Sequence, residues 1–369
     1  MPNLTTVFKK FSNILDDFLF KFTRFRQILK LRNQNSLELV LNKYIANQKN
    51  IINPFKRALP LTKYSENPIL REGNSGDWDE IGIKEPYILY NNKEFFLYYE
   101  SCTNSNEKDW QIGVATAKKI TGPWIKHPNN PILRYTNRKG DYDKQCVADP
   151  CVIFHGGKYH MWFDMYDGRK WRIGKAYSND GINWEKLKKD GKTRIILNVG
   201  KKCEWDSKFI HCPEVYLWNN RFYMLYGAVG TGHIDYDTGL AIQNDKKGEI
   251  FKKWGQVTSD EMFGKNKIVT RMQPGFILKG IIFAGLRIKV KNSYETTYMI
   301  FSDDGGKSWN KLSEPILKSG SPKQWDSKIF YGPNSWILSE KKLWCCYLGG
   351  KHKKCTSLGL AYMNLPDIV

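Results

Sequence analysis

The chain has 369 residues, 41% of them hydrophobic and 14% aromatic, and its 58 Lys and Arg against 37 Asp and Glu give a formal net charge of +21. This length allows a domain of about 300 residues together with a separate segment. The basic residues form no arginine-rich stripe and no nucleic-acid motif, so we expect no nucleic-acid partner. The eight cysteines follow no metal-site spacing, and no secretory segment opens the chain. Both observations favour reduced thiols in a cytoplasmic protein.

Residues 1–60 differ from the rest and carry eleven Lys and Arg against three acidic residues. Between Leu4 and Leu29 the apolar residues recur at the spacing of an amphipathic helix, and residues 36–47 predict a second, shorter one. The sequence therefore predicts an N-terminal α-helical extension over 1–60. Its apolar stripe is too interrupted by charge to span a bilayer. Two roles stay open: packing against protein, or contact of residues 4–30 with an anionic membrane at its inner face.

Residues 61–369 repeat one phrase around a proline. The five prolines lie 59–64 residues apart, at Pro86, Pro150, Pro213, Pro274 and Pro333. Each is followed by a short apolar run, a turn and an aromatic run, and in most units by a Gly-x-Ala run and a turn with tryptophan. This content predicts about four strands per unit, as in a propeller blade. The expected fold is all-β, a five-bladed β-propeller that begins near residue 62.

The residues that flank these prolines are not the same in each unit. Glu85 and Asp149 directly precede their prolines, whereas Glu214 directly follows its own. Because side chains alternate along a strand, we expect these three carboxylates to share a face at one mouth of the channel, with His211 beside them. Converging carboxylates are what cleavage of a glycosidic bond requires.

Further polar residues are candidates for binding a substrate. Arg271 and Arg287 could hold a carboxylate or phosphate, although an inter-blade salt bridge is an equally good interpretation. Other candidates are Gln273 and Asn334, which flank the later prolines, and Asp164 and Tyr99, which end aromatic runs. By contrast, an aspartate recurs before the proline phrase in four units and is interpreted as structural: Asp79, Asp143, Asp206 and Asp326.

On these phrases, over about residues 62–363, the chain resembles the five-bladed β-propeller glycosidases of families 32, 43, 68, 117 and 130. The resemblance implies that Glu85, before the first proline, is the base or nucleophile, and that Asp149 supports it. In those families a Glu two residues before the third proline is the acid. Here His211 stands at that place and Glu214 follows the proline, so either residue could take the acid role.

The expected function is therefore an enzyme that cleaves or transfers a glycosidic linkage in bacterial surface glycan or polysaccharide metabolism. One alternative is a glycosyltransferase or phosphorylase that uses a sugar phosphate or nucleotide sugar on the same propeller. Another is a glycan-binding propeller without activity, which the His211 substitution favours. No cofactor or metal site is expected, and a Ca²⁺ ion in the channel is compatible with the fold but not indicated by the residues.

Overall fold

The computed structural model describes residues 60–103, 109–230, 237–258, 267–290, 295–327, 329–352 and 355–364. The helical extension predicted for the N-terminal segment lies outside these ranges. Within them the regular elements are all β-strands, as the sequence predicts. None of the described residues belongs to a helix long and apolar enough to cross a membrane.

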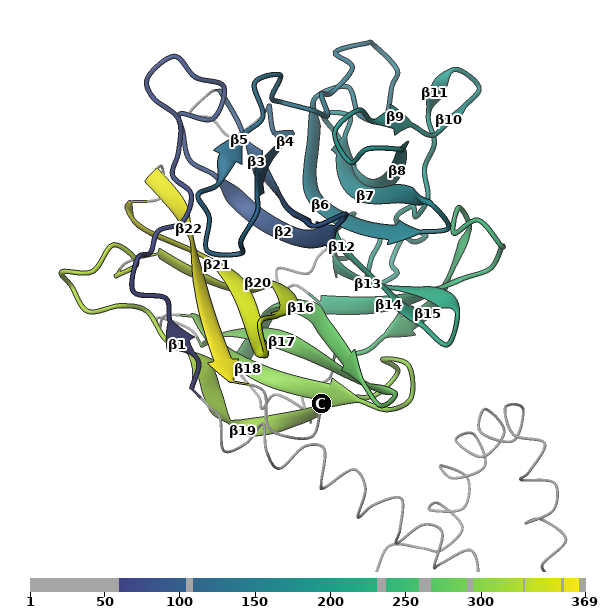
Figure 1. Ribbon diagram of the computed structural model, residues 1–369. Coiled ribbons are helices and arrows are strands. Elements are labelled where there is room, and N and C mark those ends of the chain that lie inside the picture. The colour runs from purple at the N-terminus through teal and green to yellow at the C-terminus, as the bar shows by residue number, and fades with distance from the viewer. Residues whose placement is uncertain are drawn as a thin grey trace, which may run out of the picture. The chain divides into compact units, whose positions relative to one another are not determined.

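Five antiparallel four-stranded sheets form the blades of a propeller (Figure 1). Blade one contains β2 (Lys84–Asn91), β3 (Glu94–Ser101), β4 (Gln111–Ala117) and β5 (Ile125–Lys126). Blade two contains β6 (Cys146–His155), β7 (Lys158–Tyr166), β8 (Trp171–Ser178) and β9 (Glu185–Lys186). Blade three contains β12 (Phe209–Trp218), β13 (Arg221–Val229), β14 (Asp237–Gln243) and β15 (Phe251–Gln256).

The other two blades follow the same order with one exception. Blade four contains β16 (Lys267–Leu278), β17 (Ile281–Val290), β18 (Glu295–Ser302) and β19 (Asn310–Leu317). Blade five contains β20 (Ile329–Ser339), β21 (Lys342–His352), β22 (Cys355–Asn364) and, as its outermost strand, β1 (Thr62–Lys63). A small hairpin of β10 (Lys188–Lys189) and β11 (Lys192–Thr193) lies between blades two and three in the chain. The start of the propeller segment therefore completes its last sheet.

The ring is closed by its innermost strands. The first strand of each blade contacts the first strands of both neighbouring blades: β2, β6, β12, β16 and β20 in cyclic order. The five repeated prolines all lie on these strands, as the sequence predicts. The hydrophobic core fills the spaces between blades, with clusters between blades one and two, two and three, three and four, and one and five.

The recurring aspartates link the loop before each first strand to its own blade through hydrogen bonds and ion pairs. In three blades the carboxylate contacts a tyrosine hydroxyl of the second strand and a lysine of the outermost strand: Asp79 with Tyr99 and Lys126, Asp206 with Tyr226 and Lys253, Asp326 with Tyr347 and Lys63. In blade two Asp143 pairs with Lys186. All four carboxylates are buried and paired, so their structural interpretation is confirmed.

Candidate active site at the channel mouth

A backbone irregularity positions the residue before the proline in the first three blades. Between Lys84 and Tyr87, β2 has one residue more than the facing stretch of β3, and the same bulge occurs in β6 and β12. The bulged residues have left-handed backbones, with φ of 45° at Glu85, 50° at Asp149 and 53° at Cys212. Such values are costly for residues other than glycine, and they cluster at functional sites.

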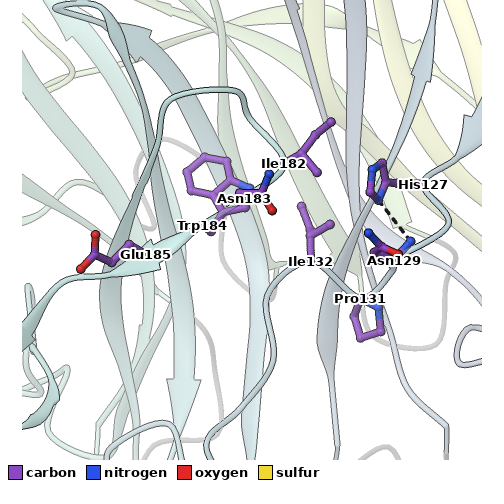
Figure 2. A pocket seen from close by; sticks show the side chains of 8 residues that line it. All are labelled: His127, Asn129, Pro131, Ile132, Ile182, Asn183, Trp184 and Glu185. Atoms are coloured by element: carbon purple, nitrogen blue, oxygen red, sulfur yellow. Dashed lines mark hydrogen bonds between the residues drawn. The ribbon is translucent and has the colours of Figure 1, made fainter.

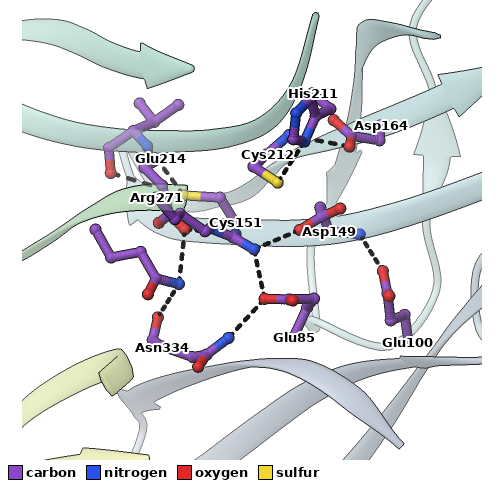
Figure 3. A network of polar contacts seen from close by, with 12 residues as sticks. Glu85, Glu100, Asp149, Cys151, Asp164, His211, Cys212, Glu214, Arg271 and Asn334 are labelled. Atoms are coloured by element: carbon purple, nitrogen blue, oxygen red, sulfur yellow. Dashed lines mark hydrogen bonds and ion pairs between the residues drawn. The ribbon is translucent and has the colours of Figure 1, made fainter. Parts of the chain in front are cut away.

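One guanidinium group joins the three carboxylates that the sequence predicts to converge. Arg271 on β16 contacts Glu85 and, at 2.7 Å, the Oδ1 atom of Asp149 through Nη1, and its Nη2 donates to Glu214 Oε1 at 2.6 Å. Figure 3 shows these side chains reaching the arginine from three blades. Arg271 is buried, whereas the side chains of Glu85 and Asp149 are 17% and 13% exposed, so these two acids reach solvent at the channel mouth.

Two amides complete the contacts around the carboxylates. The Nε2 atom of Gln273 donates to Glu214 Oε1 and to the backbone carbonyl of Asn334, both at 3.2 Å. Asn334 donates through Nδ2 to Glu85 Oε2 at 2.5 Å. The structure thus brings Glu85, Asp149, Glu214, Gln273 and Asn334 together around Arg271, with side chains from all five blades.

Two buried acids on second strands support the bulges of the next blade. Glu100 on β3 accepts the backbone N–H of Asp149 through Oε2 at 2.7 Å, and Asp164 on β7 accepts that of Cys212 through Oδ2 at 2.9 Å. Each contact satisfies a backbone donor that the bulge withdraws from the sheet ladder. From the sequence, Glu100 at the end of an aromatic run could line the channel rim, although a turn at the blade edge is the favoured interpretation.

Blade three uses a different arrangement at the same register. Lys84 pairs with Glu100 and Ala148 with Asp164, but His211 pairs with Gly227. A Cβ atom on Gly227 would lie 3.1 Å from both Cε1 and Nε2 of the imidazole, so glycine leaves room for this ring. His211 Nδ1 lies 2.7 Å from Cys212 Sγ. The ring therefore occupies the space that an acid fills in the first two blades.

The carboxyl groups of the site differ in pKa. Burial raises the pKa of Glu214 to about 7, and the charge of Arg271 only partly offsets this effect. Burial also acts to raise the pKa of Asp149, but Arg271 and then His211 outweigh it, and the pKa is lowered. A carboxyl group that holds a proton near neutral pH thus lies beside one that stays ionised, which is the pattern of an acid–base site.

The pKa values of the neighbouring side chains are shifted as well. Burial, followed by the charge of Asp149, raises the pKa of both Glu100 and Asp164, so both hold a proton more readily than exposed acids. Burial lowers the pKa of His211 to about 4, and Arg271 and Arg287 act in the same direction. The imidazole is therefore neutral at neutral pH. Arg287 pairs in register with Arg271 across β16 and β17, which places the two arginines on adjacent strands.

One predicted binding residue lies elsewhere. The hydroxyl of Tyr99 donates to Asp79 Oδ2 at 3.1 Å and accepts from Asn130 at the same distance, and its ring stacks on Trp78. These contacts are those of the repeated structural aspartates, and tyrosines of blades three and five take the same place. The side chain of Tyr99 is fully buried inside blade one, so the structure places it with these structural contacts and not with the carboxylate cluster.

A hollow of about 390 Å³ lies between blades one and two and shares no residue with the carboxylate cluster. Its lining includes His127, Asn129, Ile182, Asn183 and Trp184 (Figure 2). The indole nitrogen of Trp184 donates to the carbonyl of Gly181 at 3.1 Å, which fixes the ring in the hairpin. This hollow contains no set of converging acids, so the channel mouth is the better candidate for the active site.

Known proteins resemble parts of the propeller in sequence. Residues 64–271 match the family described as glycosyl hydrolases family 43. An uncharacterized protein of Mycobacterium tuberculosis is 35% identical over 234 residues, which covers 47% of this chain and 76% of the relative. The β-1,2-mannobiose phosphorylase of a Thermoanaerobacter species is 26% identical over 141 residues, covering 34% of this chain and 44% of that protein.

Solved structures show the same fold. The β-1,2-mannobiose phosphorylase of Listeria innocua superposes with a TM-score of 0.60 at 12% identity, covering 82% of this chain and 96% of that one. Identity at this level shows the fold alone. The family match spans more than half of the 369 residues, and the five-bladed propeller and its channel-mouth acids agree with it. The chain therefore belongs to glycosyl hydrolases family 43 and is a carbohydrate-active enzyme.

Proposed function

We propose that this enzyme cleaves or transfers a glycosyl group at the channel mouth, with Glu85, Asp149 and Glu214 as its working carboxylates. The observation that carries the proposal is the convergence of these acids, from three consecutive blades, on the guanidinium group of Arg271. Reactions at a glycosidic bond need one carboxyl group to donate a proton and another to attack or to activate the acceptor. Strands of a rigid ring hold such groups more precisely than loops do.

The proposed roles follow from where each group lies. Glu85 reaches solvent and is the base or nucleophile, while Asp149, on the same guanidinium nitrogen, orients and tunes it. Glu214 is the acid; Arg271 and Gln273 hold its Oε1 atom and leave Oε2 to carry the proton. His211, at the place of the usual family acid, is the alternative donor.

A second candidate is phosphorolysis or transfer from an activated sugar, with a sugar phosphate as substrate or product. Its support is the pair of arginines on adjacent strands, Arg271 and Arg287. Among the described residues, the buried Nε atom of Arg271 donates no hydrogen bond, so the group retains a donor for an oxyanion. The similarity to β-1,2-mannobiose phosphorylases points the same way.

The test is a comparison of acceptors. Purified protein is incubated with β-1,2-mannobiose, with a panel of 4-nitrophenyl glycosides and with nucleotide sugars, each with and without inorganic phosphate. Mannose 1-phosphate that appears only with phosphate, detected by ³¹P NMR, would establish phosphorolysis. Release of free sugar without phosphate would establish hydrolysis. If nothing in the whole panel turns over, the proposed range of substrates is wrong.

We further propose that the enzyme acts on a bacterial surface polysaccharide or its precursor, on the cytoplasmic side of the membrane. Support comes from the net charge of +21 and from the basic, amphipathic pattern of residues 4–30. Fractionation of cells that express the full chain tests this proposal. Recovery of the protein outside the cytoplasm and inner membrane would contradict it.

A further inference from the structure

Three side chains with metal-binding atoms face one another beside the carboxylate cluster. Asp164 on β7 and His211 and Cys212 on β12 each offer an oxygen, a nitrogen or a sulfur, and these atoms lie within 4.8 Å of one another. Ligand atoms around a tetrahedral zinc ion, with bonds of about 2.0–2.3 Å, are separated by roughly 3.3–3.8 Å. Small side-chain rotations would therefore bring the three donors onto one ion. Figure 3 shows them grouped next to Asp149.

Asp164 has an oxygen available for such an ion. Its Oδ2 atom accepts the backbone N–H of Cys212 at 2.9 Å. Its Oδ1 atom is buried and receives no N–H donor among the described residues, and the whole residue is only 1% exposed. The remaining hydrogen bond of the Asp164 carboxyl group is a proton shared with Asp149, and a bound cation would replace that proton.

The backbone of blade three brings the other two donors together. The left-handed bulge at Cys212 turns its thiol toward the imidazole, and Nδ1 and Sγ lie 2.7 Å apart. Gly227 leaves room for the ring where the first two blades carry an acid. Binding of an ion requires the two atoms to part to roughly 3.3–3.8 Å, which replaces one hydrogen bond by two metal bonds. His211 is partly exposed, so the site lies near the surface of the described structure.

The charges of the surrounding residues leave room for a cation. Five carboxyl groups gather in the cluster: Glu85, Glu100, Asp149, Asp164 and Glu214. The cationic side chains that interact with these carboxyl groups include Arg271 and Lys84, and Arg287 acts on His211. A divalent ion that replaces the protons of Asp164 and Cys212 would leave the net charge of the cluster unchanged.

We propose that Asp164, His211 and Cys212 bind one divalent ion of the zinc class. Thiolate and imidazole ligands favour zinc and its transition-metal neighbours over calcium or magnesium, which prefer oxygen. Three protein ligands leave a fourth position for water or for an oxygen atom of a substrate, as in catalytic zinc sites. The ion would tie blade two to blade three at the channel mouth. This site is separate from the proposed roles of Glu85 and Glu214, and it can be tested without a substrate.

The experiment is a metal titration of the full-length protein. Reduced protein is stripped with a chelator and titrated with Co²⁺, whose bond to a thiolate gives a charge-transfer absorption in the near ultraviolet. We expect one equivalent of Co²⁺ to bind with this absorption and one equivalent of Zn²⁺ to displace it. Cys212→Ser should abolish the absorption and weaken Co²⁺ binding by at least about 100-fold. Cys203→Ser, which removes an exposed thiol outside the cluster, should change neither.

His211→Gln and Asp164→Asn provide further readings, and circular dichroism verifies that each variant is folded. Both should weaken Co²⁺ binding while keeping the thiolate available. Absence of stoichiometric Co²⁺ and Zn²⁺ binding to the wild type would overturn the proposal, as would an unchanged absorption in Cys212→Ser. Should Cys212→Ser fail to fold, the titration of His211→Gln decides: full affinity there contradicts the site, and loss of affinity supports it.

Discussion

At the scale of single residues, Arg271 determines what the channel mouth can do. Its guanidinium group is buried and contacts carboxylates of Glu85, Asp149 and Glu214. A planar group with several fixed N–H donors suits this task, since it can direct separate hydrogen bonds to acids on different strands. Without it three acids would repel one another across a small, poorly solvated space. Arg271 is therefore both a structural counterion and a candidate ligand for an anionic substrate.

Replacing Arg271 by glutamine should destabilise the folded protein by about 3–5 kcal/mol, because the change leaves buried carboxylates without their counterion. The measurement is urea unfolding at neutral pH. Lys118→Gln is the control: Lys118 also pairs with a carboxylate, that of Glu94, but the two side chains are 78% and 31% exposed, so the expected loss is about 0–1 kcal/mol. Equal losses in the two variants would show that burial does not decide the role of Arg271.

Glu85→Gln and Glu214→Gln should each lower turnover by about 10²–10⁴, because an amide keeps the shape of the carboxyl group but cannot transfer its proton. Any substrate that the wild type processes can be used, with kcat and KM measured separately. Glu94→Gln is the control, since Glu94 lies on β3 of the same first blade and pairs with the exposed Lys118. Full turnover in both test variants would remove these residues from the catalytic roles.

The sequence predicts which residues form the site better than it predicts the contacts between them. The register of Glu85, Asp149 and Glu214 around repeated prolines is visible in one chain, and the structure brings these residues together. The sequence interpretation left Arg271 open between an anion ligand and an inter-blade salt bridge; the structure shows the latter, with acids of the protein itself. Such pairing depends on which strands become neighbours across the channel, and that is a long-range property that local patterns do not contain.

At the scale of elements, the bulge in the first strand explains why the site forms. The sequence argument assumes regular alternation, which would put residues on either side of a proline on one face. Instead, an extra residue with a left-handed backbone precedes the proline in blades one to three. Bulges depend on the facing strand and on hydrogen-bond acceptors such as Glu100 and Asp164 in the previous blade. They could not be predicted from the repeat alone.

The contact between blades two and three contains a buried lysine that makes stability depend on pH. Lys175 on β8 donates to the carbonyl groups of Lys247 and Gly248, at 3.0 and 2.9 Å, and its ammonium group lies 4.4 Å from the centre of the Trp162 ring. Burial lowers its pKa to about 7, although Glu249 and Asp245 act in the opposite direction. Above this pH the folded protein releases a proton that the unfolded chain keeps.

Because unfolding then takes up a proton, the stability of the wild type should rise with pH relative to Lys175→Met. The expected difference in slope is about 1.4 kcal/mol per pH unit between roughly pH 7 and 10. Urea unfolding across this range measures it. Lys188→Met, which removes an exposed lysine of the neighbouring hairpin, should follow the wild-type curve. Parallel curves for wild type and Lys175→Met would show that the buried amine does not change its protonation on folding.

At the scale of the whole propeller, completion of the last blade depends on a strand of two residues. β1 pairs with β22, so the earliest described part of the chain completes the last blade. Around it Leu61 donates its backbone N–H to Ile316, Tyr64 donates to Leu360, and Lys63 pairs with the buried Asp326. The sequence predicts where the propeller begins, but so short a strand has no periodicity from which its partner could be inferred.

Truncation at two points should distinguish the contribution of β1 to the stability of the propeller from that of the N-terminal segment. A chain that begins at residue 60 keeps β1 and should unfold cooperatively at the temperature of the full-length propeller. A chain that begins at residue 66 loses the pairing of β1 with β22, the backbone hydrogen bonds of Leu61 and Tyr64, and the lysine partner of Asp326, an expected cost of about 2–5 kcal/mol. Differential scanning calorimetry compares them. If both truncated chains melt together, the ring does not depend on β1.

The same chain that begins at residue 60 tests the predicted role of the segment it lacks. Residues 4–30 lie outside the described structure, and their sequence combines an apolar stripe with clustered Lys and Arg. A basic residue near an anionic bilayer contributes about 1 kcal/mol, and this attraction is screened by salt. Full-length protein should therefore float with liposomes that contain phosphatidylserine and detach as salt rises, whereas the truncated chain should stay in solution. Equal flotation of both would assign the stripe to packing against protein, since the remaining propeller carries many dispersed lysines that could bind such lipids without it.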